Sequence, residues 1–145
     1  MADEPIPIDA ILTDLDSQWN ASNVTKPSFI TVNAANQPIR YDLNVGDVII
    51  GRTGSPAMGE EPIGNWKYGN RSYNIELELF SLSGRQRLFN LMQEVRRICH
   101  ARKHSLSNFQ RQQFMGFSEE TSEQVNVWTG TIEVELVNDG VLLDT

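Results

Sequence analysis

Three carboxylates could form a nuclease-like metal cluster, because they fall on two segments that we expect to be neighbouring strands. They are Asp47, Glu76 and Glu78. A pair of divalent ions held by such acids could activate water against a phosphodiester. That chemistry also needs a lysine just past the second carboxylate pair, and Leu77 and Leu79 flank Glu78 instead. Exposed strand acids are the favoured interpretation, and a small metal-dependent hydrolase is the alternative.

Two histidines and one cysteine are the other candidates for metal or nucleophilic chemistry. His100 and His104 are four residues apart, a spacing at which one helix face can chelate a metal. The intervening residues include no glutamate of the zincin type, so ordinary helix histidines are favoured. Basic neighbours could activate the Cys99 thiol, but its place on an apolar stripe favours a small buried hydrophobe. We therefore predict no metal and no cofactor.

A glycine-rich segment has the glycine spacing of a phosphate-binding loop. It runs from Gly54 to Gly59. A phosphate-binding loop continues with lysine and serine or threonine, whereas Glu60 and Glu61 follow here and would repel phosphate. Pro56 also removes one backbone donor. A flexible loop is therefore the favoured interpretation.

The basic residues are concentrated in one segment of an acidic chain. Residues 85–111 hold seven lysines and arginines against one glutamate, which gives this segment a charge of +6. Since the net charge of the chain is −7, the rest of the chain carries −13. Such a segment could bind nucleic acid through phosphates, although the overall acidity and the lack of interleaved aromatics disfavour this function. Opposite charges in separate segments suit a protein that meets its own copies. Pairing within one molecule is the other interpretation.

Hydrophobic periodicity predicts the elements that would position these residues. Apolar residues at helical spacing indicate helices over 8–19 and 83–103, the second with a Ser83–Gln86 capping box. Alternation and β-branched runs indicate strands over 29–32, 47–52, 72–82, 109–117 and 124–137. A long irregular segment is predicted over 53–70. The pattern predicts one α+β domain, with an N-terminal arm at 1–7 and a C-terminal tail at 138–145.

Three apolar patterns predict the core. The second helix carries a stripe of Leu88, Leu91, Met92, Val95, Ile98 and Cys99. The strand over 72–82 turns one side inward, made of Tyr73, Ile75, Leu77 and Leu79. In the last strand, Trp128, Ile132, Val134 and Leu136 share one parity, which Gly130 interrupts. A chain of 145 residues can bury this much apolar surface without a metal or disulfide staple.

The single cysteine excludes an intramolecular disulfide and favours a reducing compartment. The first residues have neither a basic start nor an apolar run, so we expect no secretory signal. We also expect no membrane span, because no stretch is long and apolar enough.

The order of these elements resembles that of the tail-terminator (tail-completion, neck) proteins of tailed bacteriophages and archaeal tailed viruses. The resemblance covers about residues 8–137. It rests on the phrases Asp47-Val-Ile-Ile-Gly, Gly59-Glu-Glu-Pro-Ile-Gly, Arg71-Ser-Tyr-Asn-Ile-Glu-Leu-Glu-Leu and Arg87-Leu-Phe-Asn-Leu-Met-Gln-Glu-Val-Arg-Arg-Ile. The family has no catalytic signature that could be carried over.

The resemblance implies a mixed, mostly antiparallel sheet with two helices on one face, and no enzyme activity. It implies a virion protein made in the host cytoplasm that closes into a homo-hexameric ring. Its partners would be the tail tube protein and the head connector, adaptor or neck protein, with genomic DNA passing through an acidic lumen without specific binding. Another head-completion or neck component, or a nucleic-acid-binding accessory protein, remains the alternative.

Contact residues can be predicted only from their chemistry. The segment 53–70 contains apolar side chains that we expect to meet a partner: Met58, Ile63, Trp66 and Tyr68. Charge pairing between copies would join two sets, the bases Arg96, Arg97 and Arg102 and the acids Glu119, Glu120 and Glu123.

Overall fold

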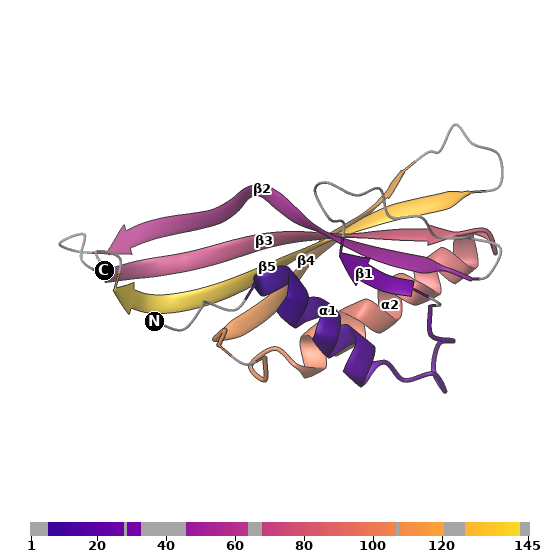
Figure 1. The fold of residues 1–145 in the computed structure, drawn as a ribbon, viewed down its shortest axis with the longest axis horizontal. Coiled ribbons are helices and arrows are strands. Elements are labelled where there is room, and N and C mark those ends of the chain that lie inside the picture. Colours follow the sequence, from indigo (N-terminus) through magenta and orange to yellow (C-terminus); the bar gives the residue numbers. More distant parts are fainter. Residues whose placement is uncertain are drawn as a thin grey trace.

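The computed structural model describes residues 6–27, 29–32, 46–63, 68–106, 108–120 and 127–142. Along them follow α1 (Pro7–Gln18), β1 (Phe29–Val32), β2 (Val48–Ile63), β3 (Tyr68–Ser81), α2 (Arg85–Ala101), β4 (Arg111–Glu120) and β5 (Trp128–Leu142). In these ranges the strands form one sheet, in the order β1-β2-β3-β5-β4. β1 is parallel to β2, and the other neighbouring pairs are antiparallel. Both helices cover one face of the sheet (Figure 1), which confirms the predicted α+β fold class.

The apolar stripe of α2 lies at the centre of the core, as predicted. Leu88, Leu91, Val95 and Ile98 are at most 1% exposed. Burial of each such side chain contributes about 1.5–3 kcal/mol before conformational entropy is subtracted. No helix in the described ranges is long and apolar enough to cross a membrane.

The predicted capping box at the start of α2 is wrong. The N-cap is Gly84, with a φ of 107°, and no side chain caps the helix. Glycine enters this left-handed region without the steric penalty of a Cβ. The N–H of Ser83 donates to the hydroxyl of Ser81 at 3.1 Å. The turn from β3 into α2 therefore depends on glycine conformation and on Ser81, and Gln86 does not reach back to it.

α1 packs directly on the backbone of β2. Its buried face carries Ile8, Ile11, Leu12 and Leu15. A Cβ built on Gly51 would lie 2.9 Å from the Cδ1 of Leu12, so only glycine allows this close approach. The predicted amphipathic helix is confirmed, and it begins at Pro7, where a missing backbone donor costs little.

The middle strands alternate as predicted. On β3, Ile75, Leu77 and Leu79 face the helices and are at most 2% exposed. Leu77 stands opposite Ile132 of β5 in the antiparallel register. We call this side the helix face and the opposite side the open face. Trp128 shares the parity of Ile132 but is 43% exposed, because it pairs with Ser81, the last residue of β3.

The segment 53–70 is not the irregular loop that the sequence predicts. β2 continues to Ile63, and its pairing with β3 resumes at Met58–Tyr73 after an irregularity that follows Thr53. Glycine and proline disfavour strands, yet an edge strand tolerates proline because its outward N–H needs no partner in the sheet. β5 likewise extends to Leu142, so the predicted tail is strand over 138–142.

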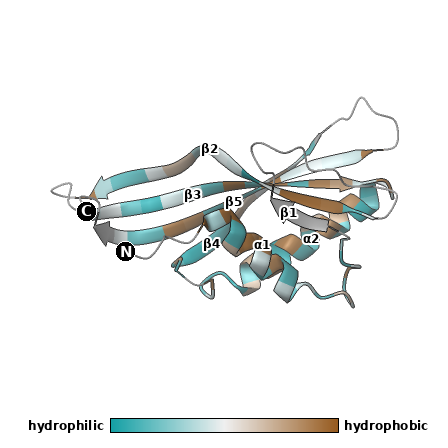
Figure 2. Cartoon of the chain, in the orientation of Figure 1, coloured by the Kyte–Doolittle hydropathy of each residue, from teal (hydrophilic) through white to brown (hydrophobic). Residues whose placement is uncertain are grey.

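The extended strands build an arm beyond the helices. We define the arm as residues 58–63 of β2, 68–72 of β3 and 137–142 of β5. Figure 1 shows these three strands running side by side past the helical layer. Figure 2 shows hydrophobic residues gathered where the sheet meets the helices, whereas β2 and β3 are mostly hydrophilic or neutral within the arm. The arm is therefore a three-stranded ribbon that the helices do not cover.

Candidate interaction surfaces

The three acids considered as a nuclease-like cluster are divided between the two sides of the sheet. Asp47 accepts a 2.6 Å hydrogen bond from Arg87 of α2, on the helix side of the sheet. Glu78 pairs with Arg52 at 3.2 Å on the open face. Among the described residues, no group of three or more histidine, cysteine or acidic side chains could hold a metal ion. Asp47 and Glu78 therefore form ion pairs with arginines.

The histidine and cysteine candidates are also placed in structural contacts. His100 lies against the ring of Phe114, with centroids 6.4 Å apart. The Nδ1 of His104 lies 3.2 Å from the carbonyl oxygen of Gln110. Cys99 is 1% exposed, and burial, with a smaller contribution from Asp14, raises the pKa of its thiol to about 12. A thiol in this state is a poor nucleophile.

The glycine-rich segment lies inside β2, with β3 beside it. Gly54 packs against Asn74 of β3, and a Cβ added to Gly54 would lie only 2.9 Å from the Cβ of Asn74. The side-chain amide of Asn74 donates to the carbonyl oxygen of Pro56 at 2.9 Å. A phosphate-binding loop precedes a helix, whereas this segment is part of a hairpin.

Ion pairs within the chain neutralise most of the basic segment. The pairs are Arg85–Glu119, Arg87–Asp47, Arg97–Glu94, Arg102–Asp14 and Arg111–Asp139. A guanidinium that is already paired gains less from a phosphate than a free one. The arrangement therefore does not favour nucleic acid as the ligand of this helix.

The predicted charge contacts between copies are thus only partly available. Arg97 and Arg102 form ion pairs within the chain, and Glu119 accepts hydrogen bonds from the Nε and Nη2 atoms of Arg85. Arg96 is exposed and makes no ion pair with any described residue. The side chain of Glu120, and Glu123 as a whole, lie outside the described residues. Intermolecular pairing stays a prediction for which Arg96 is the best-placed base.

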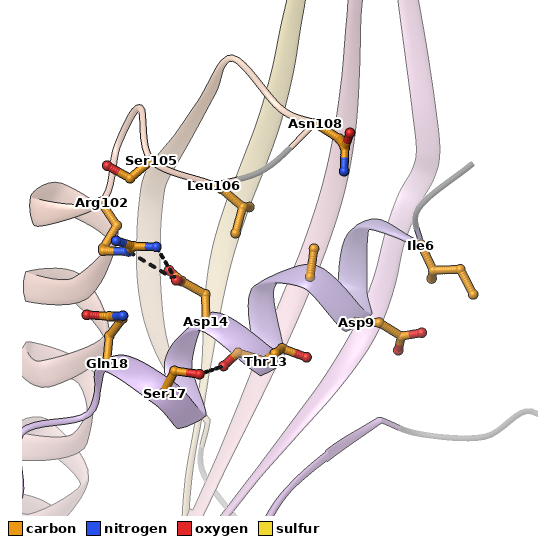
Figure 3. A pocket seen from close by; sticks show the side chains of 11 residues that line it. Ile6, Asp9, Thr13, Asp14, Ser17, Gln18, Arg102, Ser105, Leu106 and Asn108 are labelled. Carbon is orange, nitrogen blue, oxygen red and sulfur yellow. Dashed lines mark hydrogen bonds and ion pairs between the residues drawn. The ribbon is translucent and has the colours of Figure 1, made fainter. Parts of the chain in front are cut away.

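A hollow of about 420 Å³ lies between α1 and the segment after α2. Figure 3 shows Asp14 facing Arg102 across it, with a hydrogen bond of 3.0 Å between Arg102 Nε and Asp14 Oδ1. The second oxygen of Asp14 is buried and has no hydrogen-bond partner in the part of the chain that the structure describes. The pair holds α1 to the end of α2, and sequence periodicity gave no signal for it because the partners are 88 residues apart.

The exposed apolar residues of the arm form the first candidate contact surface. Ile63 and Tyr68 are 54% and 53% exposed and stand directly opposite each other in the register of β2 and β3. They lie on the open face of the arm, since Tyr68 has the parity of the open-face residue Glu76. Met58 is 46% exposed on the other face. Trp66 lies outside the described residues.

A second exposed apolar group lies at the start of α2. Phe89 is 41% exposed, and its ring meets that of Phe117 on β4 edge to face at a centroid distance of 6.3 Å. Phe89 is not among the contact residues predicted from the sequence, although its position off the buried stripe of α2 is a signal for an exposed contact. Trp128 is exposed where β5 begins.

The open face of the sheet is acidic. Glu76 of β3 stands directly opposite Glu133 of β5, and Glu78 and Glu135 share their face. Like charges at directly opposed positions destabilise a sheet. Beside them lies a hollow of about 230 Å³ that Met115 also lines.

Comparison with known proteins gives a likeness of fold. No protein-family model matches the sequence. No curated protein matches it either. Among solved structures, the chain is similar to one from the "Virion of native gene transfer agent (GTA) particle", with a TM-score of 0.66 and 9% identity. The match covers 92% of this chain and 95% of that chain.

Proposed function

We propose that this chain is a non-catalytic structural subunit of a phage-like virion. The observation that carries the proposal is the likeness to a chain of a gene transfer agent virion over nearly the full length of both chains. The placement of the candidate catalytic groups agrees with it. Asp47 and Glu78 serve ion pairs, and the thiol of Cys99 is buried.

Within such a particle we assign the chain to a tail-terminator or neck ring. The arm and the start of α2 both expose large apolar side chains that a partner could cover. Two different surfaces on one molecule suit a heterologous interface, which closes into a ring when the rotation between neighbours allows it. The remaining ring surfaces would cap the tail tube and receive the head connector.

The acidic open face suits a path for DNA. Carboxylates such as Glu76 and Glu133, crowded on one face, would repel a duplex and keep it from adhering. We therefore place this face toward the lumen of the ring. Neutralising these glutamates should slow DNA passage, and unchanged delivery of DNA would contradict the placement.

The direct test is removal of the gene for this chain from the element that encodes it. Electron microscopy of the resulting particles should show tails of uncontrolled length and heads without tails, and supply of the intact chain should restore joined particles. Normal, infectious or DNA-delivering particles without the chain would overturn the proposal.

A further inference from the structure

The arm and the start of α2 lie too far apart to contact each other within one molecule. Tyr68 and Ser81 are the two ends of β3, which places them about 43 Å apart at 3.3 Å per residue. Phe89 follows one turn into α2, close to the end that holds Ser81. An exposed apolar pair and an exposed phenylalanine therefore sit near opposite ends of the sheet.

The second surface is a stripe along α2. Arg85, Phe89, Gln93, Arg96 and His100 recur at three- and four-residue steps, and all five are exposed. The contacts of Phe89 with Phe117 and of His100 with Phe114 place this stripe on the side of α2 that faces β4. We call it the α2 stripe. On the other flank of the helix, Arg97 donates a hydrogen bond to the carbonyl oxygen of Gln18 in α1, and Arg87 pairs with Asp47, just before β2.

The charges of the two surfaces are complementary. The described arm carries Glu60, Glu61 and Asp139 against Arg71, a net charge of −2. Glu60 pairs with Arg71 at 3.0 Å, whereas Glu61 makes no ion pair with a described residue. The α2 stripe carries two arginines and no acid: Arg85 pairs with Glu119, and Arg96 is exposed and makes no ion pair with a described residue.

We propose that the arm of one copy docks along the α2 stripe of a second copy, with Ile63 and Tyr68 on Phe89 and with Glu61 paired to Arg96. The inference rests on the proposed ring and assigns its interface.

The spacing of the groups fits this docking. Glu61 and Ile63 share one face of β2 and are about 7 Å apart. Phe89 and Arg96 are about 10 Å apart along α2, and a helical side chain points back toward the N-terminus, which carries the guanidinium toward Phe89. The six residues of β2 in the arm, 58–63, are about 20 Å long, which is close to the length of α2, roughly 25 Å.

The outer edge of β2 favours docking by side chains over addition of a strand. Pro56 and Pro62 lack the N–H that a strand ladder needs, and the pairing of β2 with β3 is irregular after Thr53. The contact therefore depends on exposed side chains, so it can be tested residue by residue.

Site-directed disulfides test the contact, because the native Cys99 is buried and does not interfere. Single variants Ile63→Cys and Phe89→Cys are mixed under mild oxidation at the highest concentration the protein tolerates, and association is followed in parallel by sedimentation. The mixed dimer should form at least about tenfold faster than that of a control mixture, Glu133→Cys with Phe89→Cys. The double variant Ile63→Cys/Phe89→Cys should give a ladder of linked copies.

Charge reversal is the second test of the contact. Glu61→Arg and Arg96→Glu should each weaken association about fivefold, and the two together should restore it, whereas Glu133→Arg should not. If copies associate but the disulfide forms no faster than in the control and the charges do not compensate, the inference is overturned and the proposed ring stands. If the copies do not associate at all, the inference and the proposed ring both fail.

Discussion

The ring of Phe117 on β4 lies against the Cα of Gly130 on β5, and a Cβ added to Gly130 would fall 2.6 Å from the Cε2 of that ring. Phe117 also meets Phe89 edge to face. The absence of a side chain at position 130 therefore sets how β4, β5 and the start of α2 pack together.

The first prediction concerns this packing. Gly130→Ala should lower the free energy of unfolding by about 1–3 kcal/mol, because the ring must move and carries the Phe89 contact with it. Gly116→Ala is the matched control, since a Cβ there meets nothing within 4 Å. Urea unfolding curves of both variants measure the difference. Equal stability of the two would contradict the packing described here.

The second prediction concerns the ion pair between Arg87 and Asp47. Arg87→Ala should cost about 2–4 kcal/mol of unfolding free energy, because a largely buried carboxylate loses its partner. Lys26→Ala removes the exposed pair with Asp16 and should cost no more than about 1 kcal/mol. Thermal or urea unfolding distinguishes the two, and similar losses would show that burial does not govern the effect.

The third prediction concerns pH. Hydrogen bonds from Arg85 hold the pKa of Glu119 below its ordinary value. A carboxyl of this kind contributes stability above its unfolded pKa, and that contribution is lost as the pH falls through the folded pKa. An NMR titration should therefore show the pKa of Glu119 rising in Arg85→Ala and staying unchanged in Lys26→Ala. An unaltered titration in Arg85→Ala would rule out the pair in solution.

The fourth prediction concerns DNA. Because most arginines of residues 85–111 are paired within the chain, the purified protein should not retard duplex DNA in a gel even at low salt. A shifted band that disappears steeply with added salt, and that is lost in Arg96→Ala, would revive the nucleic-acid-binding alternative.

The main elements could be predicted because the sequence repeats its apolar residues at the period of each element. Leu88 to Cys99 on α2 and Ile75 to Leu79 on β3 lie where their spacing places them. Burial dominates these segments, so local pattern and tertiary packing agree.

The arm could not be predicted, because its strands bury few apolar side chains and their sequence is typical of a loop. Gly59 and Pro62 disfavour a strand locally, and only the pairing of β2 with β3 keeps that part of β2 extended. The Asp14–Arg102 pair depends on a contact between distant elements, which a single sequence does not display. Of the residues that we propose as contacts, Ile63, Tyr68 and Arg96 were predicted from the sequence, whereas Phe89 and Glu61 were found from the structure.

We propose above that this chain works as one of several copies built into a particle. The most direct measurement is the protein composition of purified particles from the encoding element, by mass spectrometry, combined with antibody labelling under the electron microscope. We expect the chain to be present in several copies at the junction of head and tail. Particles that deliver DNA but contain no trace of the chain would contradict it.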